Sequence, residues 1–462
     1  MWRRLATLGA VFLGCCLSGN ILVNNLFAQG AIRAELPNDV MLGRLGLQRA
    51  WWAQAAIDPL QDRVKHLMAD EQVTVIQSIT GLVTVVDNAN GRRLWSVQVG
   101  DPHELRFAAV TNERLVLVIS GTQLYGLDKR TGNVAWQVAV PTAASAPPGM
   151  DDERAYVGSV NGTIYAYDLK FLEGLTRNPL RAKEAFKSLK WQYKTGARII
   201  YPPISTGTVV VVASTDASLY GFAAKQRKLL FQFETNEPLS APMTQFGRLM
   251  FVATADRKAY CIDVETGQIK WELLSGLNLR QAVRVIGDHV FVRPEGYGLR
   301  CLSLTKASPL WTNRQAVSFL AATPAVVYAS DGLGNVLLLD QKDGHQLGAF
   351  SMRLFPIRVA NDRTDRMYFA SNRGLVVCVR EREREFPLFH KSPEKASVLP
   401  DVAPDAQGGK PAPAAKTPKK KPAGDEEATE EKKEAADAAP AAGAKPTPPK
   451  PGKPAAPDDA EK

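Results

Sequence analysis

The sequence predicts an all-β fold, an eight-bladed β-propeller of four-stranded antiparallel blades, with a short N-terminal helix and a disordered C-terminal tail. This prediction rests on one repeated pattern. An apolar strand is followed by an Asp, a Thr-Gly turn and a second strand that contains a Trp, as in residues 261–271. The aromatic residue that ends the pattern recurs at intervals of 41, 55, 40, 40, 40 and 39 residues. Short apolar runs typical of strands fill each interval. A period of about 40 residues with strands inside each unit is typical of a propeller.

The repeated letters have physical roles. Gly at the turn accepts the positive φ that a tight hairpin requires, and Asp can hydrogen-bond the turn backbone. A Trp supplies a large flat surface that one blade can bury against the next. We therefore predict that the repeat aromatics are structural and do not stack on a ligand. They are Trp95, Trp136, Trp191, Phe231, Trp271 and Trp311, with Phe350 as a seventh copy.

The propeller is predicted to occupy residues 62–390, because eight units of about 40 residues need about 320 residues. The eighth blade, which begins near residue 355, is the weakest copy. Its fourth strand must come from residues 386–390, after the charged run 380–385. Such a run fits either an exposed edge strand or a loop. Seven blades is therefore the alternative count.

Residues 1–30 have the features of a secretory signal peptide. Arg3 and Arg4 precede an apolar run over residues 5–17, and small residues near Ala28 fit a cleavage site. Two alternatives stay open. Cys15 follows a loose lipoprotein cleavage box, and an uncleaved membrane anchor is conceivable, although several polar residues make this stretch a poor spanning helix. All three interpretations predict export to the periplasm or cell envelope.

Residues 31–61 are predicted as an N-terminal helical segment. Asn38 or Asp39 would cap a helix that runs to about Ala56 and carries Trp51 and Trp52. We expect the apolar stripe of this helix to dock on the propeller. A surface for a partner protein is the alternative.

Two groups of basic residues are candidate contact sites. An insertion over residues 169–189 accounts for the 55-residue interval and contains a predicted basic helix. Propeller insertions lie on loops at one face, where binding surfaces are usually built, although a solvated helix is the alternative. Other arginines fall on predicted first strands and would face the central channel. The candidates are Arg181, Lys183 and Lys187 in the insertion, and Arg106, Arg198, Arg284 and Arg358 on the first strands.

The composition changes abruptly at residue 391. Residues 391–462 contain 13 Lys against 13 Asp plus Glu, with no Arg and no aromatic residue, so they are predicted to be disordered. The formal net charge of +10 therefore resides in residues 1–390. A basic body favours acidic proteins, an anionic polymer or a membrane surface as partners, and export disfavours nucleic acid.

No catalytic, cofactor-binding or metal-binding residue is predicted. The five histidines show no metal-ligand spacing, and the turn aspartates are explained by the repeat. Cys261, Cys301 and Cys378 stand at equivalent positions in three different blades. We expect them to be small buried side chains and not a disulfide framework.

The repeat Tyr-x-x-Asp-x-x-Thr-Gly-x-x-x-Trp, in residues 125–136 and 260–271, resembles the pyrroloquinoline-quinone-type propeller repeat. The resemblance covers about residues 62–390. It implies the propeller fold, and its family includes quinoprotein dehydrogenases and the non-enzymatic propeller lipoprotein of the outer-membrane β-barrel assembly machinery. The sequence departs from many of the dehydrogenases because its only vicinal cysteines, Cys15 and Cys16, lie in the predicted signal.

Together these features predict an exported, non-enzymatic propeller that acts as a scaffold for protein–protein interaction in the bacterial cell envelope, with no cofactor. The alternative is a pyrroloquinoline-quinone-dependent dehydrogenase that uses the central funnel. A polymer-binding module is a third hypothesis.

Overall fold

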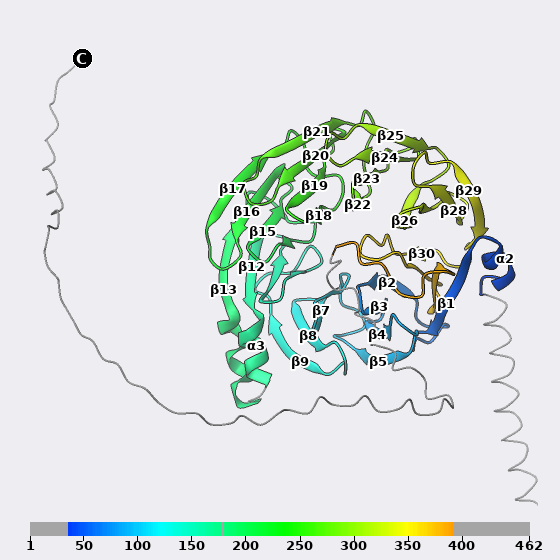
Figure 1. The fold of residues 1–462 in the computed structure, drawn as a ribbon. Helices are drawn as coiled ribbons and strands as arrows, with labels where there is room; N and C mark the ends of the chain where they lie inside the picture. Colours follow the sequence, from blue (N-terminus) through cyan, green and yellow to red (C-terminus); the bar gives the residue numbers. More distant parts are fainter. Residues whose placement is uncertain (1–35, 177–178, 392–462) are drawn as a thin grey trace, which may run out of the picture. The chain divides into compact units, whose positions relative to one another are not determined.

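The computed structural model describes residues 36–176 and 179–391. The predicted signal peptide and nearly all of the predicted tail lie outside the described residues. The described chain forms eight four-stranded antiparallel sheets, which confirms the prediction of eight blades over seven. Figure 1 shows the sheets as blades around a ring, with first strands such as β22 (Arg284–Ile286) towards its centre.

Seven blades are built from four consecutive strands each. Blade one contains β2 (Val64–Ala69), β3 (Val73–Ser78), β4 (Leu82–Asp87) and β5 (Arg93–Gln98). Blade two contains β6 (Val110–Thr111), β7 (Leu115–Ser120), β8 (Gln123–Asp128) and β9 (Val134–Ala139). Blade three contains β10 (Gly149–Met150), β11 (Arg154–Gly158), β12 (Thr163–Asp168) and β13 (Leu189–Lys194). Blade four contains β14 (Ile204–Ser205), β15 (Val209–Ala213), β16 (Ser218–Ala223) and β17 (Leu229–Glu234).

The next three blades follow the same order. Blade five contains β18 (Thr244–Phe246), β19 (Leu249–Ala253), β20 (Lys258–Asp263) and β21 (Ile269–Leu274). Blade six contains β22, β23 (His289–Val292), β24 (Leu299–Ser303) and β25 (Pro309–Asn313). Blade seven contains β26 (Ser318–Ala322), β27 (Val326–Ser330), β28 (Asn335–Asp340) and β29 (Gln346–Ser351).

The last blade takes its outer strand from the other end of the chain. It combines β30 (Ile357–Arg358), β31 (Met367–Ala370) and β32 (Leu375–Glu381) with β1 (Leu47–Gln54), which pairs antiparallel with β32. In Figure 1 the blue β1 lies at the outer edge of the orange last blade. The ring is thus closed by pairing between the two ends of the propeller sequence.

This pairing corrects two predictions. The predicted helix is capped by Asn38, as expected, but it is only α2 (Asp39–Arg44), and the segment that was predicted to continue it is β1. Residues 386–390 do not supply the fourth strand of blade eight; Phe389 makes only an isolated bridge to Thr364. The physical reason is the free edge of β32, which β1 satisfies along its length, so tertiary pairing overrides local helical periodicity.

The Asp and Gly residues of the repeat turn have the predicted hydrogen bonds and backbone conformation. In blade five the Asp263 carboxylate accepts backbone N–H bonds from Glu265 (3.0 Å) and Thr266 (3.2 Å), and Gly267 has a φ of 72°. Only glycine adopts this left-handed conformation without cost, so the turn sequence and the hairpin shape are matched.

The repeat aromatics pack between blades, as predicted. Five buried indole groups each donate their Nε1–H to a backbone oxygen in the next blade. The bonds run from Trp51 to Asn88 (2.7 Å), Trp95 to Lys129 (2.9 Å), Trp191 to Ala224 (3.1 Å), Trp271 to Leu304 (2.7 Å) and Trp311 to Gln341 (2.9 Å). Trp51 on β1 is therefore the eighth-blade copy of the motif, and the sequence pattern had missed it.

Four of the aromatic rings, those of Trp51, Trp95, Phe231 and Trp311, also cover a turn glycine of the following blade. A Cβ atom added to Gly132 would lie 2.4 Å from the Trp95 ring, and one added to Gly267 would lie 2.6 Å from the Phe231 ring. Phe231 keeps this packing although it has no N–H to donate. Trp136 keeps the burial, but its Nε1 has no hydrogen-bond partner in the described part of the chain, because the next blade continues directly into a helix at Leu169.

The residue opposite most of the aromatics is small, which leaves room for the ring. Trp271 faces Cys261, Trp311 faces Cys301 and Trp51 faces Cys378 across the third and fourth strands. All three thiols are free and buried, and burial raises the pKa of each to about 12. They are small core residues, as the sequence predicted.

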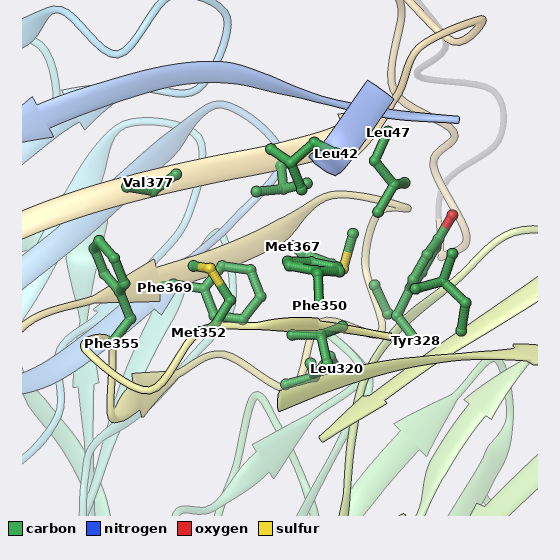
Figure 2. Close-up of a cluster of buried hydrophobic side chains, with 14 of the residues drawn as sticks. Leu42, Leu47, Leu320, Tyr328, Phe350, Met352, Phe355, Met367, Phe369 and Val377 are labelled. Carbon is green, nitrogen blue, oxygen red and sulfur yellow. The ribbon is translucent and has the colours of Figure 1, made fainter. Parts of the chain in front are cut away.

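The prediction that Phe350 is the repeat aromatic of blade seven is wrong. Register places Gly348, and not Phe350, opposite Leu338 at the position of the repeat aromatic. The Leu45 side chain occupies the vacant space, 2.7 Å from where a Cβ of Gly348 would lie. Phe350 instead packs in the cluster between blades seven and eight, where Figure 2 shows it with Leu42 and Leu47 from the N-terminal segment.

We expect Trp51→Ala to lower the free energy of unfolding by about 3–5 kcal/mol, because it removes a buried indole from the closing strand. Urea unfolding followed by the remaining Trp fluorescence measures the change. Trp52→Ala is the matched control, because the neighbouring Trp52 side chain is 42% exposed against 5% for Trp51, and it should cost less than about 1 kcal/mol. Equal losses for the two variants would contradict ring closure by β1.

Candidate functional site

A large hollow of the described propeller lies among the turns that join the first and second strands of the blades. It has a volume of about 810 Å³ and is lined by such turns from blades one to five and by two residues of blade eight. We call it the acidic cavity. Its charged lining is Asp70, Glu71, Glu113, Asp151, Asp152 and Glu153 against Lys129, Lys225, Arg363 and Lys391.

One wall of the acidic cavity contains a buried ion pair between two blades. Lys129 Nζ lies 2.7 Å from the Asp70 carboxylate, and the two side chains are 6% and 2% exposed. The same carboxylate accepts hydrogen bonds from Thr111 Oγ1 (2.6 Å) and the Val73 backbone N–H (2.7 Å). Burial alone would raise the pKa of Asp70, but Lys129 and these donors outweigh it and lower the pKa below its usual value. The pair fixes blade one against blade two.

A second buried carboxylate links blades six and eight. Asp362 lies 3.3 Å from Arg284 and 2.9 Å from Lys391. Burial would raise the pKa of Asp362, but the two cations lower it strongly. Burial lowers the pKa of Lys391 in turn. The predicted interaction candidate Arg284 is thus held inside the ring by an ion pair.

The blade-three insertion forms helix α3 (Leu169–Thr176) and the 3₁₀ helix η1 (Pro179–Ser188), and it lies beside the acidic cavity. Lys170 lies 3.0 Å from Glu153 on the cavity rim. Arg114 lies 3.0 Å from Glu173 of α3 and donates to the Asp152 carbonyl at 3.3 Å. Two ion pairs therefore tie the insertion to the rim, so that both belong to one face of the propeller.

The exposed part of the insertion carries an aromatic ring. Phe186 is 69% exposed, beside Lys187, which lies 3.2 Å from Glu184. Arg181 and Lys183 belong to η1, and their side chains lie outside the described part of the structure. Of the three predicted contact residues of the insertion, only Lys187 has a described side chain. The exposed Phe186 was not among the predicted contact residues.

Only two of the four predicted first-strand arginines are brought together. Arg106 is buried and donates to backbone oxygens that include those of Ile79 (3.1 Å) and Glu104 (3.2 Å), so it ties loops together. Arg198 is exposed. Arg284 and Arg358 are brought together, since both line a second cavity among blades five to eight.

Sequence reasoning missed the acidic cavity because its carboxylates stand in different repeats. The sequence did contain one sign of the cavity. An Asp or Glu stands between the first and second strands of blades one, two and three, at Glu71, Glu113 and Asp152. Within residues 36–176 and 179–391, no group of three or more His, Cys, Asp and Glu side chains is placed to hold a metal ion. Over the same residues, no helix is long and apolar enough to cross a membrane.

Comparison with known proteins gives the family. The pattern of the family described as outer membrane protein assembly factor BamB matches residues 80–173 and 232–403, more than half of the chain. The chain belongs to the BamB family. BamB of Nitrosomonas eutropha is 24% identical over 185 residues, which are 39% of this chain and 41% of that protein's own length. The match therefore spans less than half of that BamB.

Solved structures show the same fold as this BamB-family chain. The crystal structure of BamB from Moraxella catarrhalis superposes with a TM-score of 0.55 at 14% identity, covering 72% of this chain and 99% of that one. The computationally designed Ika8 protein gives the same values. That a designed protein matches equally well indicates that the likeness is one of fold.

We expect Asp70→Asn to lower the free energy of unfolding by about 3–5 kcal/mol at pH 7, because it leaves the buried Lys129 ammonium without a countercharge. The folded pKa of Asp70 is depressed, so its stabilisation is complete above the unfolded value of about 3.9 and is lost as pH falls through the folded value. The difference between wild type and variant should therefore shrink below about pH 4.

Urea unfolding between pH 3 and pH 7 measures this difference. Asp152→Asn is the control, because Asp152 lies on the same cavity but is exposed. A variant effect that did not change with pH would contradict the assigned ion pair.

Proposed function

We propose that this BamB-family chain is an exported, non-enzymatic propeller that binds partner proteins in the bacterial cell envelope during outer-membrane protein assembly. The observation that carries the proposal is the face described above, where the acidic cavity and the insertion with exposed Phe186 are joined by the ion pairs of Lys170 and Arg114. A rigid ring that holds such a face in one shape lowers the entropy cost of binding.

The charge of the acidic cavity favours a basic partner segment. Six carboxylates and four cationic side chains line the cavity, although the chain as a whole carries +10. Complementary charge steers association and selects partners, and an exposed aromatic side chain such as Phe186 supplies an anchor. The partner would therefore insert lysines or arginines at the cavity and cover the insertion with an apolar patch.

Site-specific crosslinking in intact cells tests the proposal. We expect Phe186→p-benzoylphenylalanine to form defined protein adducts after irradiation. Leu347→p-benzoylphenylalanine, at a 54% exposed position on blade seven, should form none. Adding Asp152→Lys should reduce the yield of adducts about tenfold. This corresponds to a loss of about 1.4 kcal/mol of binding free energy. Adding Glu234→Lys, on the outer strand of blade four, should leave them unchanged. Equal adducts from both crosslinking positions would refute a specific face.

A separate titration tests the non-enzymatic part of the proposal, because the wider propeller family includes quinoprotein dehydrogenases. Pyrroloquinoline quinone is added with calcium to the purified chain while Trp fluorescence is followed. A flat titration is expected. Saturable quenching at micromolar quinone would favour the dehydrogenase alternative.

A further inference from the structure

A second cavity lies at the opposite end of the first strands from the acidic cavity. It has a volume of about 310 Å³ and lies where the chain enters β22 and β26, so it is distinct from the turns between first and second strands. Its charged lining consists of four arginines: Arg280, Arg284, Arg293 and Arg358. We call it the arginine pocket. No acidic side chain is among its lining residues.

Two of the four guanidinium groups have a countercharge. Arg280 lies 3.2 Å from Glu295, and Arg284 lies 3.3 Å from Asp362. The second of these is weakly compensated, because Lys391 lies 2.9 Å from the same Asp362 carboxylate. Glu295 and Asp362 therefore each already form an ion pair with an arginine of the pocket.

The other two guanidinium groups have no carboxylate partner within the described part of the chain. Arg358 donates to the backbone oxygens of Gly334 (2.9 Å) and Phe355 (3.2 Å), which orient it but carry no charge. Arg293 forms no ion pair there, and its buried Nε has no hydrogen-bond partner among the described residues. Two guanidinium groups therefore line one cavity without forming an ion pair among the described residues, although Asp331 lies near enough to Arg358 to compensate part of its charge.

The surroundings make this arrangement costly unless an anion enters. Phe291 and Phe319 stack at 4.9 Å on the wall of the pocket, and both are buried. Burial also lowers the pKa of the Arg358 guanidinium. Charges beside apolar walls interact more strongly with a counterion than charges in bulk water do. Guanidinium forks match the oxygens of carboxylate and phosphate groups.

We propose that the arginine pocket binds a phosphate group that carries two negative charges. A dianion compensates both Arg293 and Arg358, whereas a single carboxylate would leave one of them unpaired. The group can come from a free phosphate or soluble phosphate monoester, or from the monoester headgroup of phosphatidic acid. This proposal does not rest on the proposed function, because it concerns a different cavity and needs no protein partner.

Isothermal titration of the full chain with inorganic phosphate tests the proposal at low salt. We expect saturable binding that Arg293→Gln weakens at least tenfold, because Arg293 bonds to no described residue and its loss should leave the fold intact. Arg300→Gln is the matched control: Arg300 lies in the same blade but over the Tyr297 ring, 5.0 Å from its centroid, and should not change the affinity. Sulfate should compete with phosphate, and chloride should not.

Vesicle flotation separates the two sources of the phosphate group. Vesicles of phosphatidylcholine with phosphatidic acid are compared with vesicles of phosphatidylcholine alone. Flotation that needs phosphatidic acid and is lost in Arg293→Gln assigns the pocket to a lipid headgroup; phosphate binding without flotation assigns it to a soluble ligand. Absence of saturable phosphate binding, or binding that Arg293→Gln does not weaken, would overturn the proposal.

Discussion

The ring depends on one contact that recurs between neighbouring blades, in which an aromatic side chain of the outer strand lies on the turn of the next blade. Trp95 on Gly132 shows its parts: a flat apolar surface is removed from water, and the indole N–H satisfies a backbone oxygen of the neighbouring blade. Where a ring lies on a turn glycine, as at Gly132, an added Cβ would collide with it, and most of the residues that face a ring across the strand pair are small. The aromatic, the glycine and the small residue therefore constrain one another, since close-packed interfaces leave no room for one to change alone.

The sequence predicted most of this fold because the residues that make the contact recur within a short motif in the repeats. Asp, Gly and Trp stand at fixed spacing, so blade number, turn positions and the packing of the aromatics followed from a single pattern. The closing blade was mispredicted because its aromatic, Trp51, stands at the far end of the chain from its β32 partner. Leu45 could not have been placed from sequence either, since only the structure shows that Gly348 leaves a space for it.

The candidate sites were less predictable for a related reason. The sequence identified arginines on first strands one by one, but only the ring brings Arg284 and Arg358 to one cavity and leaves Arg106 and Arg198 outside it. The acidic cavity was hidden by the net charge of +10. An average over the chain conceals the separation of charge between the two ends of the first strands, where one cavity gathers carboxylates and the other gathers guanidinium groups.

Closure by β1 has a consequence for how the chain is made. Gln54 of β1 donates to the backbone oxygen of Arg373, 319 residues further along the chain. During synthesis from the N-terminus, the first strand of the ring must therefore wait for nearly the whole propeller before its partner exists. Until then it is an unpaired edge that carries two tryptophans, the kind of segment that aggregates or attracts other strands. A chain that ends before β32 leaves the edge of β1 unpaired. The strand is therefore buried only after nearly the whole propeller has been synthesised.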